Sequence, residues 1–317
     1  MDEIFPFSPD SPVLAIGASG IDIVGSLQGE LYKGTSNPAK IRSSPGGVTR
    51  NVAENLARLG QPVVLLTAVG NDHAGEQIIK QTCSAGVDMS AAIRSSNFPT
   101  STYLGVVNSK GELQYAVDDM RATSSLTPSY LEKNAHYFEQ ASLLFLDANL
   151  SKETLRKAVS LARRARIPIC ADPASTLLAK RLRPYLSRLT LVTPNRSEAG
   201  ILCNRPNEIS TRRQSIEAAK CLVSQGVKIA IITMGEFGVC YATSEASGRV
   251  PAIRTQIVDP TGSGDALTAA VIFGLLNEMP LDEAIRLGVS AATLTLRNTG
   301  SVLPDMTLEK LYDQLVI

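Results

Sequence analysis

Uninterrupted apolar runs of strand length recur along this chain and constrain its fold more than any other feature. The runs lie at residues 13–16, 62–69, 143–146, 168–171, 189–193 and 228–233. Strands that are apolar on both faces are typical of parallel sheets covered by helices on both sides. Helical patterns at 48–59, 73–85 and 151–165 separate several of these runs. The alternation predicts an α/β fold with a doubly wound, mainly parallel sheet and helices on both faces.

Two stretches break this rhythm and predict a second, smaller sheet. Residues 23–42 and 100–117 carry alternating or polar patterns, and the second stretch contains the turn signal Asn-Ser-Lys-Gly at 108–111. We expect insertions at 23–45 and 98–120 to form a β lid. Two edge hairpins of the main sheet are the alternative. Because no repeat or low-complexity linker divides the chain, we expect one large α/β domain over residues 1–317.

Charge, cysteine content and hydropathy exclude several classes of function. The chain has 31 Lys and Arg against 30 Asp and Glu, so it has no general attraction for nucleic acid or a membrane surface. Its five cysteines are scattered and never spaced as C-x-x-C, which argues against a zinc site or a disulfide framework. No apolar run approaches the ~18 residues of a membrane span, and the Pro-broken, acidic start is unlike a signal peptide. We therefore expect a cytoplasmic protein that binds neither nucleic acid nor membranes.

The stretch IVDPTGSGDALTAAVIFG (257–274) places a carboxylate directly behind a glycine turn and at the head of an apolar helix. Gly262 and Gly264 permit backbone conformations that a side chain forbids. Such a helix start offers unpaired N–H donors and a positive dipole to an anion. Asp265 alone is also an ordinary first-turn acid, so the rest of the chain has to decide. At this position the carboxylate is expected to stay ionised at neutral pH.

Further polar groups follow predicted strands in the first part of the chain. They lie at the carboxyl ends of these strands, where α/β sheets place ligands. Asp22 can accept hydrogen bonds from hydroxyls or serve as a turn acid. Gly46 and Gly47 precede a helix, and Asn51 lies one turn inside it with both a donor and an acceptor. This pair of glycines either lets a ligand lie against the backbone or only forms a turn.

Two more stretches follow later strands and are equally ambiguous. Asn195 and Glu198 have the spacing of a capping box, and the same pair can order magnesium-bound waters. Thr233, Gly235 and Gly238 mark a strand that ends in a glycine turn, which either holds phosphate or ribose groups or merely joins two strands.

The order of these motifs resembles the ribokinase-like (PfkB) family of carbohydrate and nucleoside kinases. The chain contains GG-x-x-x-N-x-A with Gly60 and Gly70 behind it, then P-N-x-x-E, T-x-G-x-x-G and D-P-T-G-S-G-D. The resemblance extends from Gly17 to Gly300 and so covers nearly the entire chain.

Within this family, the segments at 35–60, 100–120 and 171–175 look most like pseudouridine kinases. The chain departs from the pattern at Thr49, where a smaller residue is usual. A basic residue is also expected soon after ADPAS and appears only at Lys180.

The resemblance implies roles for the residues at the glycine turns. Asp265 is implied to be the base that accepts the proton of a hydroxyl attacking the γ-phosphorus of ATP. The implied anion hole consists of the amides of Gly262, Ser263 and Gly264. The implied ribose ligands are Asp22, Gly46, Gly47 and Asn51.

The resemblance also implies sites for ATP and metal ions. Asn195 and Glu198 are implied to order Mg²⁺ and the ATP phosphates, Glu198 through water. The implied nucleotide lining is Thr233, Gly235, Gly238 and Val258, with adenine near Val258 and the helix at 284–296. Asp259 and Thr261 match part of a monovalent cation site, which would take K⁺; turn capping is the alternative role of Asp259.

Two lid residues, Lys40 and Asp119, are predicted to recognise the base, and solvated lid charges are the alternative. The leading hypothesis is an ATP-dependent pseudouridine kinase that phosphorylates the 5′-hydroxyl. The alternatives within the family are kinases for ribose, another sugar or a purine nucleoside. Outside it, they are a catalytically silent sensor and a dinucleotide oxidoreductase, whose glycine fingerprint is absent. We expect a homodimer that pairs through the exposed lid face.

Overall fold

Nine strands form the central sheet of the computed structural model, which describes residues 10–108, 111–205 and 209–315. Their spatial order is β15-β14-β13-β12-β11-β10-β1-β4-β6. The bounds are β1 Val13–Ile16, β4 Val63–Leu66, β6 Val87–Asp88, β10 Leu143–Asp147, β11 Ile169–Asp172, β12 Leu191–Val192, β13 Ile229–Thr233, β14 Val239–Ala242 and β15 Ser247–Val250. The strands from β6 to β13 pair in parallel, and β14 and β15 add an antiparallel edge. The sheet confirms the predicted α/β fold.

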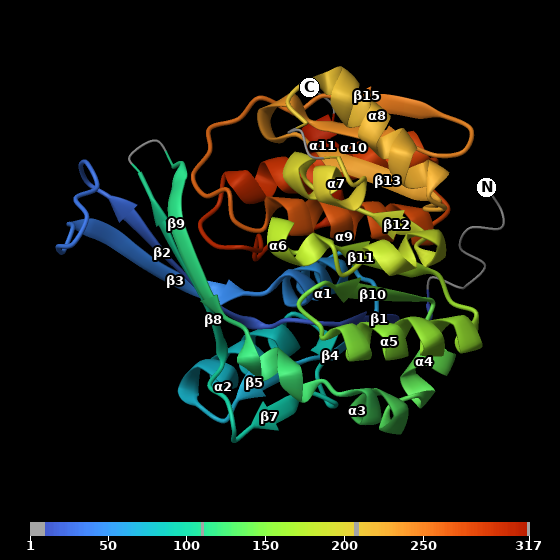
Figure 1. Ribbon diagram of the computed structural model, residues 1–317, viewed down its shortest axis with the longest axis horizontal. Helices are drawn as coiled ribbons and strands as arrows, with labels where there is room; N and C mark the ends of the chain where they lie inside the picture. Colours follow the sequence, from blue (N-terminus) through green and yellow to red (C-terminus); the bar gives the residue numbers. More distant parts are fainter. Residues whose placement is uncertain (1–9, 109–110, 206–208, 316–317) are drawn as a thin grey trace.

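Both faces of the sheet are covered, as the continuous apolar runs require (Figure 1). In β1, Val13 and Ala15 belong to one buried cluster, whereas Leu14 and Ile16 belong to another. The first cluster is formed with α1 Val48–Arg58, α9 Ser263–Leu276, α10 Leu281–Leu296 and α11 Leu308–Leu315. The second is formed with α3 Pro128–Lys133, α4 His136–Gln140, α5 Lys152–Ala165, α6 Thr176–Ala179, α7 Arg196–Leu202 and α8 Arg212–Ser224. Successive side chains of one strand thus fill two cores.

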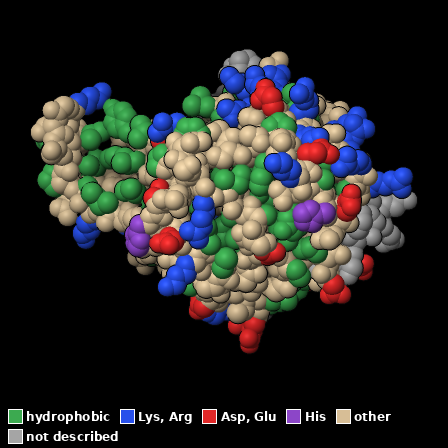
Figure 2. All heavy atoms as spheres, turned by 90° about the horizontal axis from the view of Figure 1, so that it is seen from below, with side chains coloured by type: hydrophobic (Ala, Val, Ile, Leu, Met, Phe, Trp, Pro, Cys, Tyr) green, Lys and Arg blue, Asp and Glu red, His purple; other side chains and the backbone are tan. Residues whose placement is uncertain are grey.

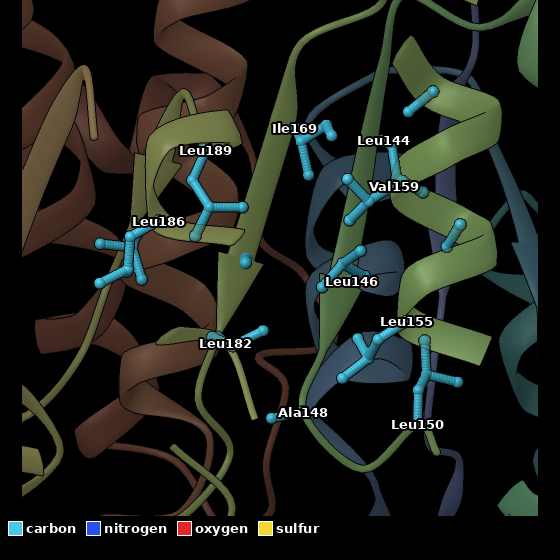
Figure 3. Packing of buried hydrophobic residues seen from close by; sticks show 14 of the residues in the cluster. Leu144, Leu146, Ala148, Leu150, Leu155, Val159, Ile169, Leu182, Leu186 and Leu189 are labelled. Carbon is cyan, nitrogen blue, oxygen red and sulfur yellow. The ribbon is translucent and has the colours of Figure 1, made fainter. Parts of the chain in front are cut away.

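The packing between β10 and α5 illustrates the second cluster (Figure 3). Leu144 and Leu146 of β10 are at most 1% exposed and lie against Leu155 and Val159 of α5. The helix presents these residues at i and i+4, so that they form one apolar stripe toward the sheet.

A second sheet, with the order β3-β2-β8-β9, projects from the main body (Figure 1). Its strands are β2 Gly20–Leu27, β3 Ala39–Gly46, β8 Ser101–Val107 and β9 Leu113–Asp119. The two predicted insertions supply most of it, and Ser109 and Lys110 of the predicted turn lie outside the described residues. Its action as a lid stays a prediction.

The apolar run at 62–69, predicted as one strand, is two. β4 ends at Leu66, and β5 Ala68–Gly70 pairs instead with β7 Ile93–Ser95 in a separate two-stranded sheet. The change of direction occurs at Thr67, whose hydroxyl donates to the Gly17 carbonyl at 2.8 Å. α2 His73–Ser84 follows, with Asp72 as its N-cap. None of the described helices is long and apolar enough to cross a membrane.

We predict that Leu146→Ala lowers the free energy of unfolding by about 2–5 kcal/mol, because it leaves a cavity between β10 and α5. Leu177→Ala is the matched control, since Leu177 is 83% exposed, and its cost should stay within about 0.5 kcal/mol. Urea unfolding followed by circular dichroism measures both. Equal midpoints for the two variants would contradict this description of the core.

Candidate active site

Acidic side chains gather at the carboxyl edge of the main sheet. Asp147 ends β10, Asp172 ends β11, and the two residues are direct partners in the strand register. Asp265, in the first turn of α9, lies close enough to both for their charges to interact. Asp22 in β2 also acts on Asp265 through its charge. Four carboxyl groups from four elements thus meet at one edge, the usual ligand position of α/β sheets.

A hydrogen bond between α1 and α9 is the centre of this arrangement. Asn51 Nδ2 donates to Asp265 Oδ2 at 2.7 Å. The Asn51 amide can face only this way, because its Oδ1 accepts from Arg50 Nη1 at 2.9 Å and lies 3.1 Å from Ser301 Oγ. Asn51 is 2% exposed and Asp265 is half-buried. The structure therefore joins the Gly-Gly and Gly-Ser-Gly motifs, which lie more than 200 residues apart in sequence.

The glycines are required where the backbone approaches other groups. A Cβ atom on Gly46 would lie 2.2 Å from the Asp22 carboxyl group, and one on Gly262 would lie 1.9 Å from the Ser301 carbonyl oxygen. Gly47, with φ at +97°, lets α1 begin directly against the Ala18 carbonyl. Four of the predicted substrate residues, Asp22, Gly46, Gly47 and Asn51, thus lie together beside Asp265.

The turn before Asp265 has the geometry of an anion site. Gly262 is the N-cap of α9 in the left-handed conformation, with φ at +76°. The first turn of a helix leaves its N–H groups without intrahelical partners, so the amides of Ser263 and Gly264 are available to an anion. That these amides form an anion hole stays a prediction.

The expectation that Asp265 is fully ionised at neutral pH is wrong. Loss of hydration raises the pKa of Asp265 to about 7, and the hydrogen bond from Asn51 offsets only part of that effect. The nearby charges of Asp22 and Asp147 raise it further. Burial likewise raises the pKa of Asp22 to about 6, although Arg50 opposes the shift. The sequence does not reveal these neighbours, because they come from separate strands.

Arg50 is a functional residue that motif reasoning missed. It is 3% exposed, pairs with Glu54 and donates to the Pro45 carbonyl at 3.2 Å. Burial lowers the pKa of Arg50 to about 10, which still leaves it charged at neutral pH. The sequence signal that could have revealed Arg50 is a charged residue among the apolar residues of the helix α1. Arg50 supplies a fixed positive charge among the acids and orients the Asn51 amide.

Thr49, the departure from the family pattern, has a structural partner. Its hydroxyl donates to Asp147 Oδ2 at 2.7 Å, and the Ala18 amide donates to the same oxygen at 2.9 Å. Asp147 is 0% exposed, so these donors replace the hydrogen bonds that its carboxylate would make with water. Thr49 therefore stabilises Asp147 at the carboxyl edge of the main sheet.

Asn195 and Glu198 form a capping box at the start of α7. Asn195 Oδ1 accepts from the Glu198 amide at 3.0 Å, and Glu198 Oε2 accepts from the Asn195 amide at 2.8 Å. Burial raises the pKa of Glu198, and the charge of Glu198 acts on Asp172. That Asn195 and Glu198 hold Mg²⁺ through water stays a prediction. The described residues contain no group of three or more His, Cys, Asp or Glu side chains arranged as direct metal ligands.

The glycine turn after β13 packs against residues 250–252, which line a cavity of about 370 Å³. A Cβ atom on Gly238 would lie 2.2 Å from the Val250 carbonyl oxygen, and Val250 lines this cavity. The other lining residues are Pro251, Ala252, Ile253, Arg254, Arg286, Val289, Arg297, Gln314 and Leu315. Thr233 ends β13 and forms a parallel bridge with Asn195, so the two predicted nucleotide motifs are adjacent. Val258 is exposed, and its amide donates to Leu296 of α10 at 2.8 Å.

The structure separates the two predicted base contacts: Lys40 lies on the same face of the second sheet as Asp22, whereas Asp119 lies on the opposite face. Lys40 is exposed in the outer half of β3. Asp119 pairs with Thr102 across the sheet, whereas Asp22 pairs with Tyr103, so Asp119 and Asp22 lie on opposite faces. Asp119 is also bound by Arg121 at 2.6 Å. Its neighbour Asp118 pairs with Tyr103 and therefore lies on the Asp22 face.

Asp259 and Thr261 do not fit a bound monovalent cation. The Asp259 carboxylate is 1% exposed and is already neutralised by Arg42 Nη2 at 2.8 Å. Its oxygens also accept from the amides of Thr261 and Gly300, at 3.0 and 3.1 Å. Arg42, on β3, was not predicted to take part.

The fold, with a half-buried carboxyl group beside a glycine turn, is that of a kinase of the ribokinase-like class, which transfers phosphoryl groups to alcohols. The chain belongs to the pfkB family of carbohydrate kinases, which it matches over residues 11–307. It is 32% identical over 297 residues to the pseudouridine kinase of Escherichia coli (strain K12), with 93% of this chain and 94% of that relative covered.

Two further comparisons show the breadth of the family. The chain is 28% identical to the guanosine-inosine kinase of Exiguobacterium acetylicum, with 93% of this chain and 97% of that relative covered. Its fold matches the Arabidopsis thaliana ribokinase complexed with ribose and ATP, with a TM-score of 0.83 at 21% identity and coverage of 97% and 99%. The family assignment confirms a phosphotransferase with an alcohol acceptor.

We predict that kcat/KM rises with pH up to about 7 and is flat above it, because Asp265 must be deprotonated to act as a base. Below about pH 6, protonation of Asp22 should steepen the fall in kcat/KM.

Asp265→Asn should lower kcat by several orders of magnitude while ATP still binds. Steady-state rates and ATP titrations across pH measure these effects. Near-normal turnover in the variant would remove Asp265 from the chemistry.

Proposed function

We propose that this protein is an ATP-dependent kinase that converts pseudouridine to pseudouridine 5′-phosphate. The observation that carries the proposal is the bond of 2.7 Å from Asn51 to Asp265, beside a helix start that can hold a phosphoryl group. The 32% identity to a pseudouridine kinase, over nearly the whole of both chains, supports the choice of acceptor.

In the proposed reaction, the 5′-hydroxyl oxygen attacks the γ-phosphorus of ATP. Asp265 takes the hydroxyl proton as the new O–P bond forms, and the bond from the γ-phosphorus to the bridging oxygen of ADP breaks. The amides of Gly262, Ser263 and Gly264 stabilise the charge on the transferred group. A pKa of about 7 suits Asp265 to this role, because a base works best near the operating pH.

Asp22 and Asn51 are proposed to bind the ribose hydroxyls, with Gly46 and Gly47 giving the sugar access to the backbone. At neutral pH an ionised Asp22 accepts two hydrogen bonds, and Arg50 stabilises that charged form. The second sheet is proposed to act as a lid over the sugar, with its Asp22 face inward. In this arrangement Lys40 on β3 contacts the nucleobase of the substrate. Asp119 faces outward, so Asp118 is proposed as the acidic contact instead of Asp119.

The nucleotide is proposed to extend from the anion hole along the loop at 251–258. Its adenine enters the cavity beside α10, whose apolar lining includes Val250, Ile253 and Val289. The phosphates pass Thr233, Gly235 and Gly238, and Mg²⁺ is held through water by Glu198 with Asn195. When bound, Mg²⁺ neutralises phosphate charge.

A homodimer through the outer face of the second sheet is also proposed. Exposed apolar side chains share this face, because the register pairs Ile41 with Gly25, Gly25 with Val106, and Leu104 with Val117. Ile41 and Val117 are 76% and 67% exposed. Figure 2 shows hydrophobic side chains gathered over this projecting sheet. A second copy of the chain would cover such a self-complementary patch.

We predict that pseudouridine gives the highest kcat/KM in a panel that also contains uridine, inosine, guanosine, adenosine, ribose and fructose. ADP release with ATP and Mg²⁺ measures the rates. Uridine is the matched control, since it lacks the extra ring N–H of pseudouridine and should be rejected by at least about tenfold. The similarity to a guanosine-inosine kinase makes a purine nucleoside the second candidate. A tenfold preference for a purine nucleoside or ribose would overturn the assignment of the acceptor.

We predict that Val117→Asp produces monomers, because a charge within the apolar face opposes pairing. The control is Leu177→Asp, at a still more exposed position on α6. Sedimentation velocity at several concentrations measures the molecular mass. A monomeric wild-type protein would refute the proposed dimer.

A further inference from the structure

A buried ion pair joins the second sheet to the loop that leads into the anion-hole turn. Arg42 Nη2 on β3 lies 2.8 Å from Asp259 Oδ1, and the Asp259 side chain is only 1% exposed. A carboxylate removed from water in this way needs a compensating charge or several hydrogen-bond donors. Arg42 is the cation that meets this need, and its own side chain is 29% exposed.

Asp259 holds together the two backbone segments that shape the turn. One oxygen accepts from the Thr261 amide at 3.0 Å, and the other accepts from the Gly300 amide at 3.1 Å. Gly262 packs against the next residue, Ser301, so closely that no side chain fits between them. The position of the Asp259 carboxylate therefore decides where the amides of the anion hole point.

The same strand reaches the base by a second route. Pro45, three residues beyond Arg42 on β3, accepts a hydrogen bond of 2.6 Å from Ser301 Oγ. That hydroxyl lies 3.1 Å from Asn51 Oδ1, and Asn51 donates to Asp265. β3 thus contacts the anion-hole turn through Arg42 and the base through Pro45, Ser301 and Asn51.

We propose that Arg42 is a positioning residue whose guanidinium takes the place of a bound monovalent cation beside Asp259. The fixed charge keeps the anion-hole turn in its working geometry and ties that geometry to the position of β3. Phosphoryl transfer at this turn therefore needs no K⁺. The inference rests on phosphoryl transfer by this family, and it holds whichever nucleoside or sugar is the acceptor.

The test compares wild type, Arg42→Ala, Arg42→Lys and the surface control Arg213→Ala. Turnover is measured with the best acceptor of the panel in KCl and in tetramethylammonium chloride at equal ionic strength. Wild type and Arg213→Ala should differ by less than about twofold between the salts. Arg42→Ala should lose about tenfold or more in kcat, with a smaller change in the acceptor KM, and regain part of the loss with K⁺ or guanidinium. Arg42→Lys should retain most of the activity.

Thermal unfolding in the same two salts provides a measurement without any acceptor. A cation that binds only the folded protein raises its melting temperature. K⁺ should therefore stabilise Arg42→Ala specifically and leave wild type unchanged, even if the predicted acceptor is wrong.

Three results would overturn the proposal. The first is a rise of about fivefold or more in wild-type turnover with K⁺, which needs no variant and so is unaffected by misfolding. The second is unchanged turnover of Arg42→Ala in tetramethylammonium chloride. The third is a loss in Arg42→Ala that neither K⁺ nor guanidinium reverses while Arg42→Lys is equally impaired.

Discussion

The hydrogen bond from Asn51 to Asp265 is the contact on which the site depends, because it fixes the base relative to both glycine motifs. It is made possible by the burial of α1 against α9, whose apolar residues share one core. Arg50 and Ser301 occupy the other side of the Asn51 amide and leave its donors pointing at the carboxylate. A single amide thereby transmits the packing of two helices to one oxygen of the proposed base.

Burial of Asp265 at this edge, and to a smaller extent the acids around it, raises the pKa of Asp265 and costs stability. Because the folded pKa of Asp265 is about 7, above its ordinary value of 3.8, the folded chain binds more protons than the unfolded chain between these values. The stability that this group contributes is therefore present below about pH 4 and is lost as the pH rises to about 7. At the pH where Asp265 becomes a base, the fold must hold an anion that it disfavours, and Arg50 reduces that penalty.

Local features were predictable from the sequence, whereas contacts between distant segments were not. The apolar runs predicted the parallel sheet. That Asn51, Asp265 and the glycine turns share a site was implied only by the resemblance of the four motifs to a known family, because each motif alone was ambiguous. The ionisation of Asp265 was mispredicted because segments distant in sequence remove its hydration, and Asp22 and Asp147 add their charges from other strands. Asp119 was chosen for its charge alone, and only the pairing of β8 with β9 shows that it faces away from Asp22. Thr67, which divides a continuous apolar run, acts through a bond to Gly17 that no local pattern indicates.

The two faces of the second sheet differ in their contacts, because one faces the candidate site and the other is exposed and apolar. Neighbouring residues on β3 belong to different faces. Arg42 points toward Asp259 and the anion-hole turn, while Ile41 points to the exposed apolar face. In the proposed dimer, a partner that covers Ile41 would restrict the movement of β3, and the pair of Arg42 with Asp259 would pass that restriction to the turn. The proposed assembly at the outer face is thus connected through one strand to the proposed anion hole, so a change that loosens the apolar face should also alter the position of the amides of Ser263 and Gly264.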